Sequence, residues 1–158
     1  MVICRTATDD DVAELAAMRW DFRLEEAPGM PRHDRATFLR ACQAFLGQGL
    51  ADQRWTYWIA TTDAQIVSHI YIQRIAKVPK PNRLDDAFGY VTNVYTRPTY
   101  RNRGVGTQLM AHVLRWAKEQ DLESLIVWPS AASVQFYVRA GFQGSSEALE
   151  YQVRPYVL

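Results

Sequence analysis

The chain has 158 residues, of which 48% are apolar and 12% are aromatic. This composition argues against a disordered chain, and the length is typical of a single domain that spans residues 1–158. The 18 basic and 17 acidic residues nearly cancel, so the chain lacks the basic excess of general nucleic-acid and membrane-surface binders.

Targeting signals, membrane spans and metal motifs are not evident in the sequence. The N-terminal segment has no long apolar core, and no run approaches the ~18 apolar residues of a membrane span. Cys4 and Cys42 are too few and too far apart for a metal motif. We therefore expect a cytoplasmic protein with reduced thiols and no bound metal.

In chain order, the first half predicts one strand and then two helices. Residues 2–7 are apolar-rich and suit an edge strand, and Thr8 with the aspartates after it suits a helix N-terminus. An amphipathic helix is predicted over 9–24, because spacings of three and four place one set of residues on the same face, namely Val12, Leu15, Arg19 and Phe22. A second helix is predicted over 34–47.

Three strands are predicted next, in segments rich in β-branched and aromatic residues. They cover 54–61, 65–75 and 87–96, with a hairpin turn at 62–65 between the first two. Residues 77–86 contain two prolines and several charges, which predicts a loop.

The last third alternates helices and strands. Apolar residues from Val105 onward predict a helix of about four turns, and 124–128 predicts a short buried strand. Residues 130–142 predict a helix closed by Gly141, and 148–157 predict a final strand. We therefore expect a mixed α/β sheet, antiparallel first and partly parallel later, covered by helices.

The stretch RNRGVG, residues 101–106, lies between a predicted strand and a predicted helix. Glycines allow close approach to the backbone, and the first N–H groups of a helix favour an anion. Arg101 and Arg103 add positive charge. The segment predicts a phosphate or pyrophosphate site, and a plain strand–helix turn with solvated arginines is the alternative.

Two familiar phosphate loops do not fit this stretch. A P-loop requires Lys followed by Ser or Thr after its last glycine, where this chain has Thr107 and Gln108. A dinucleotide fingerprint requires a third glycine at the position of Leu109, and it follows the first strand of a βαβ unit rather than lying in mid-chain.

The sequence resembles the GCN5-related N-acetyltransferase family. A strand, a proline and RNRGVG opening a long helix look like the acyl-CoA motif of that family, and FYVRAGF looks like its Tyr-x-x-x-Gly-Phe ending. The matching positions are Arg101, Gly104, Gly106, Tyr137, Gly141 and Phe142. The resemblance extends over most of the chain, is weakest over 26–85, and implies the family's mixed sheet flanked by helices.

This resemblance implies acetyl-CoA as co-substrate and a set of residues that bind it. Backbone N–H groups would hold the pyrophosphate, and a strand that splays from its parallel neighbour would pair with the pantetheine arm. The pyrophosphate residues are Asn102, Arg103, Gly104, Val105, Gly106 and Thr107, with Arg101 and Arg103 as helpers. The strand residues are Val94, Tyr95 and Thr96. Ser130 stands where many family members carry an asparagine that contacts the pantetheine, so it could substitute only partly, and Ser133 completes the cofactor set.

The resemblance also implies that Tyr137 is catalytic. A phenol of pKa ~10 near the sulfur can protonate a departing thiolate of pKa ~8.5 without being ionised itself. The alternative is a core aromatic residue. Many family members carry a glutamate on the strand at 87–96, whereas this chain offers only Thr92 and Asn93. A water chain to a more distant group is therefore expected, ending at His69, Glu25 or Glu26.

The leading hypothesis is an N-acetyltransferase that acts directly on a primary amine of a small molecule or a protein. A non-catalytic acetyl-CoA-binding sensor is the alternative. The resemblance implies an acceptor pocket built by the first two helices, the loop between them at 23–34 and the loop at 77–86. Glu25 and Glu26 could attract a cationic amine there, and charges that are merely solvated are the alternative. No nucleic-acid or membrane partner is expected, and a homodimer is possible for this fold.

Overall fold

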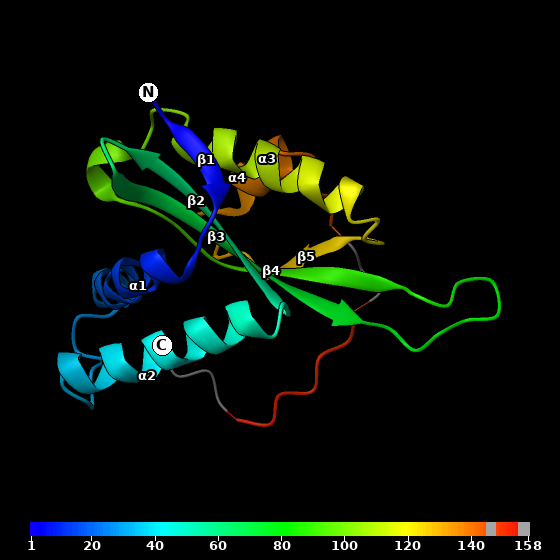
Figure 1. Cartoon of the computed structure of the whole chain (residues 1–158), viewed down its shortest axis with the longest axis horizontal. Coiled ribbons are helices and arrows are strands. Elements are labelled where there is room, and N and C mark those ends of the chain that lie inside the picture. The colour runs from blue at the N-terminus through cyan, green and yellow to red at the C-terminus, as the bar shows by residue number, and fades with distance from the viewer. Residues whose placement is uncertain (145–147, 155–158) are drawn as a thin grey trace.

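The computed structural model describes residues 1–144 and 148–154. Within them, five strands form one sheet in the order β1-β2-β3-β4-β5 (Figure 1). The strands are β1 (Ile3–Thr6), β2 (Trp55–Thr62), β3 (Gln65–Ala76), β4 (Ala87–Thr96) and β5 (Leu125–Val127). The helices are α1 (Val12–Glu26), α2 (Arg35–Ala51), α3 (Val105–Glu119) and α4 (Val134–Arg139), with short 3-10 helices η1 (Asp9–Asp11) and η2 (Pro98–Tyr100).

The sheet is mixed, as the sequence predicts. Strands β1 to β4 are joined by antiparallel pairing, and β5 pairs in parallel with β4. The predicted hairpin between β2 and β3 turns at Asp63 and Ala64, whose φ angles are 48° and 63°. Two consecutive residues at positive φ are characteristic of the tight turn that matches the twist of a hairpin.

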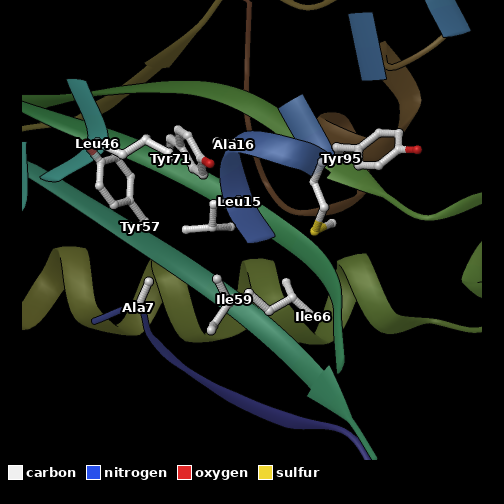
Figure 2. Packing of buried hydrophobic residues seen from close by; sticks show 10 residues of the cluster. Ala7, Leu15, Ala16, Leu46, Tyr57, Ile59, Ile66, Tyr71 and Tyr95 are labelled. Carbon is white, nitrogen blue, oxygen red and sulfur yellow. The ribbon is translucent and has the colours of Figure 1, made fainter. Parts of the chain in front are cut away.

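Helices cover both faces of the sheet. Helices α1 and α2 lie on one face, and α3 and α4 lie on the other (Figure 1). On the first face Leu15 and Leu46 pack against β2 and β3 around Tyr57, which is fully buried (Figure 2). On the second face Leu109 and Val113 of α3 pack against the sheet. The sheet therefore lies between two layers of helices, each packed against one of its faces.

Most predicted boundaries are close to the observed ones. β4 has the predicted bounds, α2 is one turn longer than expected, and α4 is much shorter. Gly141 ends α4 at φ 102°, and Phe142 N donates to Tyr137 O, as in a helix C-cap with a left-handed glycine. None of the helices in the described part of the chain has the length and apolar character needed to cross a membrane.

The predicted final strand is wrong for residues 148–154, which form no strand. Its alternating apolar side chains produced the signal, but Leu149, Tyr151 and Val153 are almost fully exposed. A strand persists only where its backbone pairs with a neighbour and one face is covered, and these residues lead away from the sheet (Figure 1). The rest of that prediction, 155–157, lies outside the described residues.

Candidate active site

The centre of the candidate site is a bulge in β4. Tyr71 opposes Thr92 and His69 opposes Tyr95, so Asn93 and Val94 together face a single residue of β3. Asn93 has a φ of 49°, which asparagine tolerates better than most residues. A bulge bends its strand and breaks the regular pairing at that point.

The parallel ladder between β4 and β5 ends just before this bulge. Its last pair is Val91 with Val127, and the chain after β5 continues into Trp128 and Pro129. Within the described residues, β4 beyond Val91 is therefore paired on one side only. The two parallel strands separate here, which is the separation that the sequence resemblance implied.

The free edge of β4 presents backbone groups from alternate residues. Arg97 N donates to Val67 O at 2.9 Å, so Arg97 and, two residues earlier, Tyr95 face β3. Ser68 Oγ also donates to Tyr95 O at 2.9 Å. Val94 and Thr96 therefore direct their backbone groups toward the opening between β4 and β5.

The N-terminus of α3 lies at the end of the same strand. The loop at 101–104 includes Asn102 at φ 58° and Gly104 at φ 77°, where a side chain other than glycine is strained. Gln108 N donates to Gly104 O at 2.9 Å. The N–H groups from Val105 to Thr107 consequently have no carbonyl partner within the helix.

The second predicted motif lies beside this helix N-terminus. A Cβ placed on Gly106 would lie 3.4 Å from Thr96 Oγ1 and 3.5 Å from the Phe136 ring. Strand β4, α3 and α4 therefore converge at Gly106. The next residue of α4, Tyr137, is buried, and its burial raises the pKa of Tyr137 to about 12.

The comparisons with known proteins agree with this geometry. The model of the acetyltransferase (GNAT) family matches residues 14–142. The chain belongs to this family. Its fold resembles a predicted acetyltransferase from Clostridium acetobutylicum, crystallised with acetyl-CoA, with a TM-score of 0.79, 27% identity and 96% of each chain covered.

Two further structures illustrate the range of the GNAT fold. A GCN5-related N-acetyltransferase from Ralstonia eutropha has a TM-score of 0.73 at 24% identity, over 96% of this chain and 99% of that one. A transcriptional regulator from Bacillus halodurans has a TM-score of 0.74 at 20% identity, over the same shares. No curated protein sequence matches the chain.

The arginines of the GNAT motif differ in their surroundings. Arg101 pairs with Glu25 of α1 at 2.6 Å, donates from Nε to Thr96 O at 2.9 Å, and lies over the Tyr95 ring. Arg103 lies over the Tyr100 ring. The Arg101 side chain therefore crosses the end of β4 toward α1. Arg103 stays at the loop and forms no ion pair with a described residue.

Ser130 and Ser133 lie together in the turn that precedes α4. Ser130 Oγ donates to Ser133 Oγ at 3.0 Å, and Ser133 Oγ donates to Ser130 O at 3.0 Å. These bonds fix the start of the short helix that carries Tyr137. Both hydroxyls are thus engaged with each other in the described chain.

The candidate bases are not poised to accept a proton at neutral pH. His69 is completely buried, its Nδ1 donates to Asn93 O at 2.7 Å, and burial lowers its pKa to about 3. The Arg101 guanidinium holds the pKa of Glu25 below its usual range. Glu26 pairs with Arg23, so each of these two glutamates is already paired with an arginine.

Sequence reasoning missed the role of Arg19. Its Nη1 donates to Asn93 Oδ1 at 2.9 Å, so α1 is bonded directly to the β4 bulge. Burial lowers the pKa of Arg19, although the group stays far from neutralisation at ordinary pH. The signal was a charged residue within the apolar stripe of a helix, a position where burial is costly unless the charge has a hydrogen-bond or ion-pair partner.

Proposed function

We propose that this protein is an acetyl-CoA-dependent N-acetyltransferase that moves an acetyl group directly to a primary amine. The observation that carries the proposal is the bulge at Asn93 and Val94, which separates β4 from β5 immediately before the N-terminus of α3. Acetyl-CoA combines an amide-bearing arm with a pyrophosphate. Those two parts are complementary to an unpaired strand edge and to free helix N–H groups.

The residues present fit this co-substrate. The backbone of Val94 and Thr96 would bind the pantetheine amides, and the backbone from Asn102 to Thr107 would bind the pyrophosphate. Gly104 supplies the left-handed turn at φ 77° that this loop needs. Arg103 adds positive charge directly, whereas Arg101 contributes most fully after leaving Glu25. Ser130 and Ser133 would add hydroxyl groups from the turn before α4.

Tyr137 is the proposed general acid. Bound acetyl-CoA supplies a thioester carbonyl for attack and a thiol as leaving group. Because burial raises the pKa of Tyr137 to about 12, its hydroxyl keeps its proton throughout the neutral range. A proton held at Tyr137 Oη can then be given to sulfur as the carbon–sulfur bond breaks, a role that contributes ~10²–10⁴-fold in comparable enzymes.

The acceptor amine must lose a proton before or during attack. For a lysine-type amine of pKa ~10.4, deprotonation at pH 7 costs about 5 kcal/mol. His69 is too weak a base to remove that proton efficiently, and Glu25 is held by Arg101. We therefore assign the proton to water in the opening, with Asn93 and Thr92 as the nearby polar side chains of β4.

A non-catalytic acetyl-CoA sensor is the second candidate. The observation that favours it is the low basicity of His69 and Glu25, since binding alone needs no base. The two candidates share the same binding surface and differ only in turnover.

A thiol-release assay with acetyl-CoA and a panel of primary amines tests the proposal. We expect acetyl-CoA to raise the melting temperature, because a ligand that binds only the native state stabilises it, and we expect at least one amine to release CoA in proportion to the acetylated product. Binding without turnover on any amine would leave the sensor, and no binding at millimolar acetyl-CoA would eliminate both candidates.

A further inference from the structure

A pocket of about 690 Å³ lies between the C-terminal half of α1, the loop after it and the start of α2. It is formed entirely by residues 19–38, and the loop at 77–86 lies at the opposite end of the sheet (Figure 1). The pocket therefore includes the first of the two loops expected to form an acceptor pocket and not the second. This volume is within the usual range for small-molecule sites.

The lining of this pocket is strongly basic. Arg19, Arg23, Arg32 and His33 all contribute to it, and no carboxylate does. Arg23 is neutralised by its ion pair with Glu26. Arg19 and Arg32 form no ion pair with any described carboxylate, although the charge of Glu26 acts on Arg19 at longer range. The pocket therefore keeps a net positive charge that an anionic group would balance.

The remaining wall of the pocket is apolar. The Trp20 and Phe38 rings pack with centroids 5.4 Å apart, and Leu24 and Met30 line the same space. Arg23 reaches Met30, with its Nη2 3.9 Å from Sδ. A ligand that fits both parts carries an anionic group and an apolar group on one small skeleton.

The inner end of the pocket meets the β4 bulge. Arg19 lines the pocket and also donates to Asn93 Oδ1, where the two parallel strands separate. Three polar atoms at this junction are buried without a hydrogen-bond partner among the described residues, namely His69 Nε2, Asn93 Nδ2 and Tyr71 Oη. Each costs about 1–3 kcal/mol unless a polar group fills the space beside it.

The chemistry of the site narrows the acceptor further. His69 and Glu25 are poor bases, so a less basic amine reacts more readily than a lysine-type amine. The α-amino group of a dipeptide has a pKa of about 8, and its deprotonation at pH 7 costs about 3 kcal/mol less than that of an amine of pKa ~10.4. The α-amino group of a free amino acid is more basic, so this advantage applies to the dipeptide. An α-amino group is also the amine that most simply accompanies a carboxylate on a small apolar skeleton.

We infer that the acceptor is a small α-amino carboxylate, a free amino acid or a dipeptide, with an apolar side chain. Arg19 and Arg32 bind its carboxylate, and Trp20 and Phe38 contact its side chain. This assignment rests on the proposed acetyltransferase function. It places the amine beside Asn93, at the mouth of the opening between β4 and β5.

The acetyl transfer needs no reactant other than acetyl-CoA and the acceptor amine. The amine nitrogen forms a bond to the acetyl carbonyl carbon, and the carbon–sulfur bond breaks with its electron pair remaining on sulfur. Sulfur takes one proton and becomes the thiol of CoA. Nitrogen loses one proton, and the product is an N-acetylated amino acid or dipeptide that keeps its carboxylate.

Matched pairs of acceptors test the inference. Phenylalanine is compared with phenylalaninamide, and leucyl-leucine with leucyl-leucinamide. Removing the carboxylate also lowers the pKa of the α-amine, most strongly in the first pair, so kcat/KM is expressed per concentration of neutral amine. Within the preferred pair, we expect kcat/KM to be at least about tenfold higher for the carboxylate compound than for its amide. The two pairs distinguish a free amino acid from a dipeptide.

Two arginine variants distinguish carboxylate binding in the pocket from the general effect of removing a positive charge. Arg32 is exposed, so Arg32→Gln should fold normally and reduce the carboxylate preference at least about fivefold. Arg40→Gln is the matched control, because Arg40 is exposed on α2, donates a hydrogen bond to Thr37 Oγ1 and does not line the pocket. The control should retain the preference of the unmodified protein.

The outcomes distinguish this inference from the proposed function. Turnover of both amides at the rate of the carboxylates, or an unchanged preference in Arg32→Gln, overturns the α-amino carboxylate and leaves an acetyltransferase. Calorimetry with CoA present measures binding separately. Carboxylate-dependent binding supports the pocket even without turnover, whereas no binding of either carboxylate compound overturns it.

Discussion

Tyr137→Phe removes one hydroxyl and keeps the ring that packs against Phe136 and Phe142. Burial raises the pKa of Tyr137 to about 12, so the unmodified residue carries its proton at every pH suitable for assay. If that proton is delivered to the departing thiolate, the variant loses the contribution of a general acid. We expect kcat to fall by ~10²–10⁴-fold, equivalent to about 3–5 kcal/mol of transition-state stabilisation.

The assay is thiol release at saturating acetyl-CoA, with calorimetry to measure the affinity for acetyl-CoA. Tyr57→Phe is the matched control, because it removes another buried phenol hydroxyl on the opposite face of the sheet, from a strand that β3 separates from β4. The control should keep both kcat and affinity. Tyr137→Phe should keep affinity and lose kcat, which separates a chemical role from a packing role.

Three results would refute this reasoning about Tyr137. A kcat within about threefold of the unmodified protein would place the proton donor elsewhere, since the expected loss is at least ~10²-fold. Weakened acetyl-CoA binding with an unchanged kcat would give the hydroxyl a binding role. A fall in kcat as pH rises from 8 to 10 that Tyr137→Phe abolishes would also contradict a phenol of pKa about 12.

Three further predictions concern the loop, its ion pair and the buried histidine. Gly104→Ala places a side chain at φ 77°, and we expect it to lower the free energy of unfolding by about 1–2 kcal/mol and to weaken acetyl-CoA binding. Gly47→Ala, in open space within α2, should instead raise the free energy of unfolding by about 0.5–1 kcal/mol. Equal effects of the two substitutions in a chemical denaturation series would contradict the left-handed conformation assigned to Gly104. Arg101→Gln should weaken acetyl-CoA binding, whereas Glu25→Gln should leave it unchanged or strengthen it by releasing Arg101, and calorimetry at two salt concentrations checks both. Burial lowers the pKa of His69 to about 3, so its contribution to stability is complete above pH 6.5 and is lost as the pH falls from 6.5 toward 3. His69→Gln should flatten the stability profile in that window, and an unchanged slope would show that His69 is not the group that titrates.

Local patterns predicted the regular elements well. The strand at 87–96 and the helix beginning at Val105 each bury one or two faces. Apolar residues therefore recur in the sequence with the period of a strand or a helix. The predicted final strand failed over 148–154 for the converse reason. Alternation records a possible buried face, but pairing depends on a partner edge elsewhere in the chain.

The candidate site was only partly predictable. The glycine loop and Tyr137 were found because their motifs are contiguous, and the assignment of acetyl-CoA contacts to them stays a prediction. The position of the bulge was not predictable, because Asn93 and Val94 form it only through the register between β3 and β4. Arg19 was missed because its partner Asn93 is distant in sequence, and the pairing of Glu25 with Arg101 was missed for the same reason.

The most direct test of the central claim is an NMR titration of the labelled protein with acetyl-CoA, following backbone amide resonances. We predict that the largest shifts occur at the free edge of β4, residues 94–96, and at the loop and first turn of α3, residues 102–107. Amides of α2 around Gly47 serve as internal controls and should move little. Saturable shifts confined to another surface, or none at millimolar acetyl-CoA, would contradict an acyl-CoA site at the β4–α3 junction.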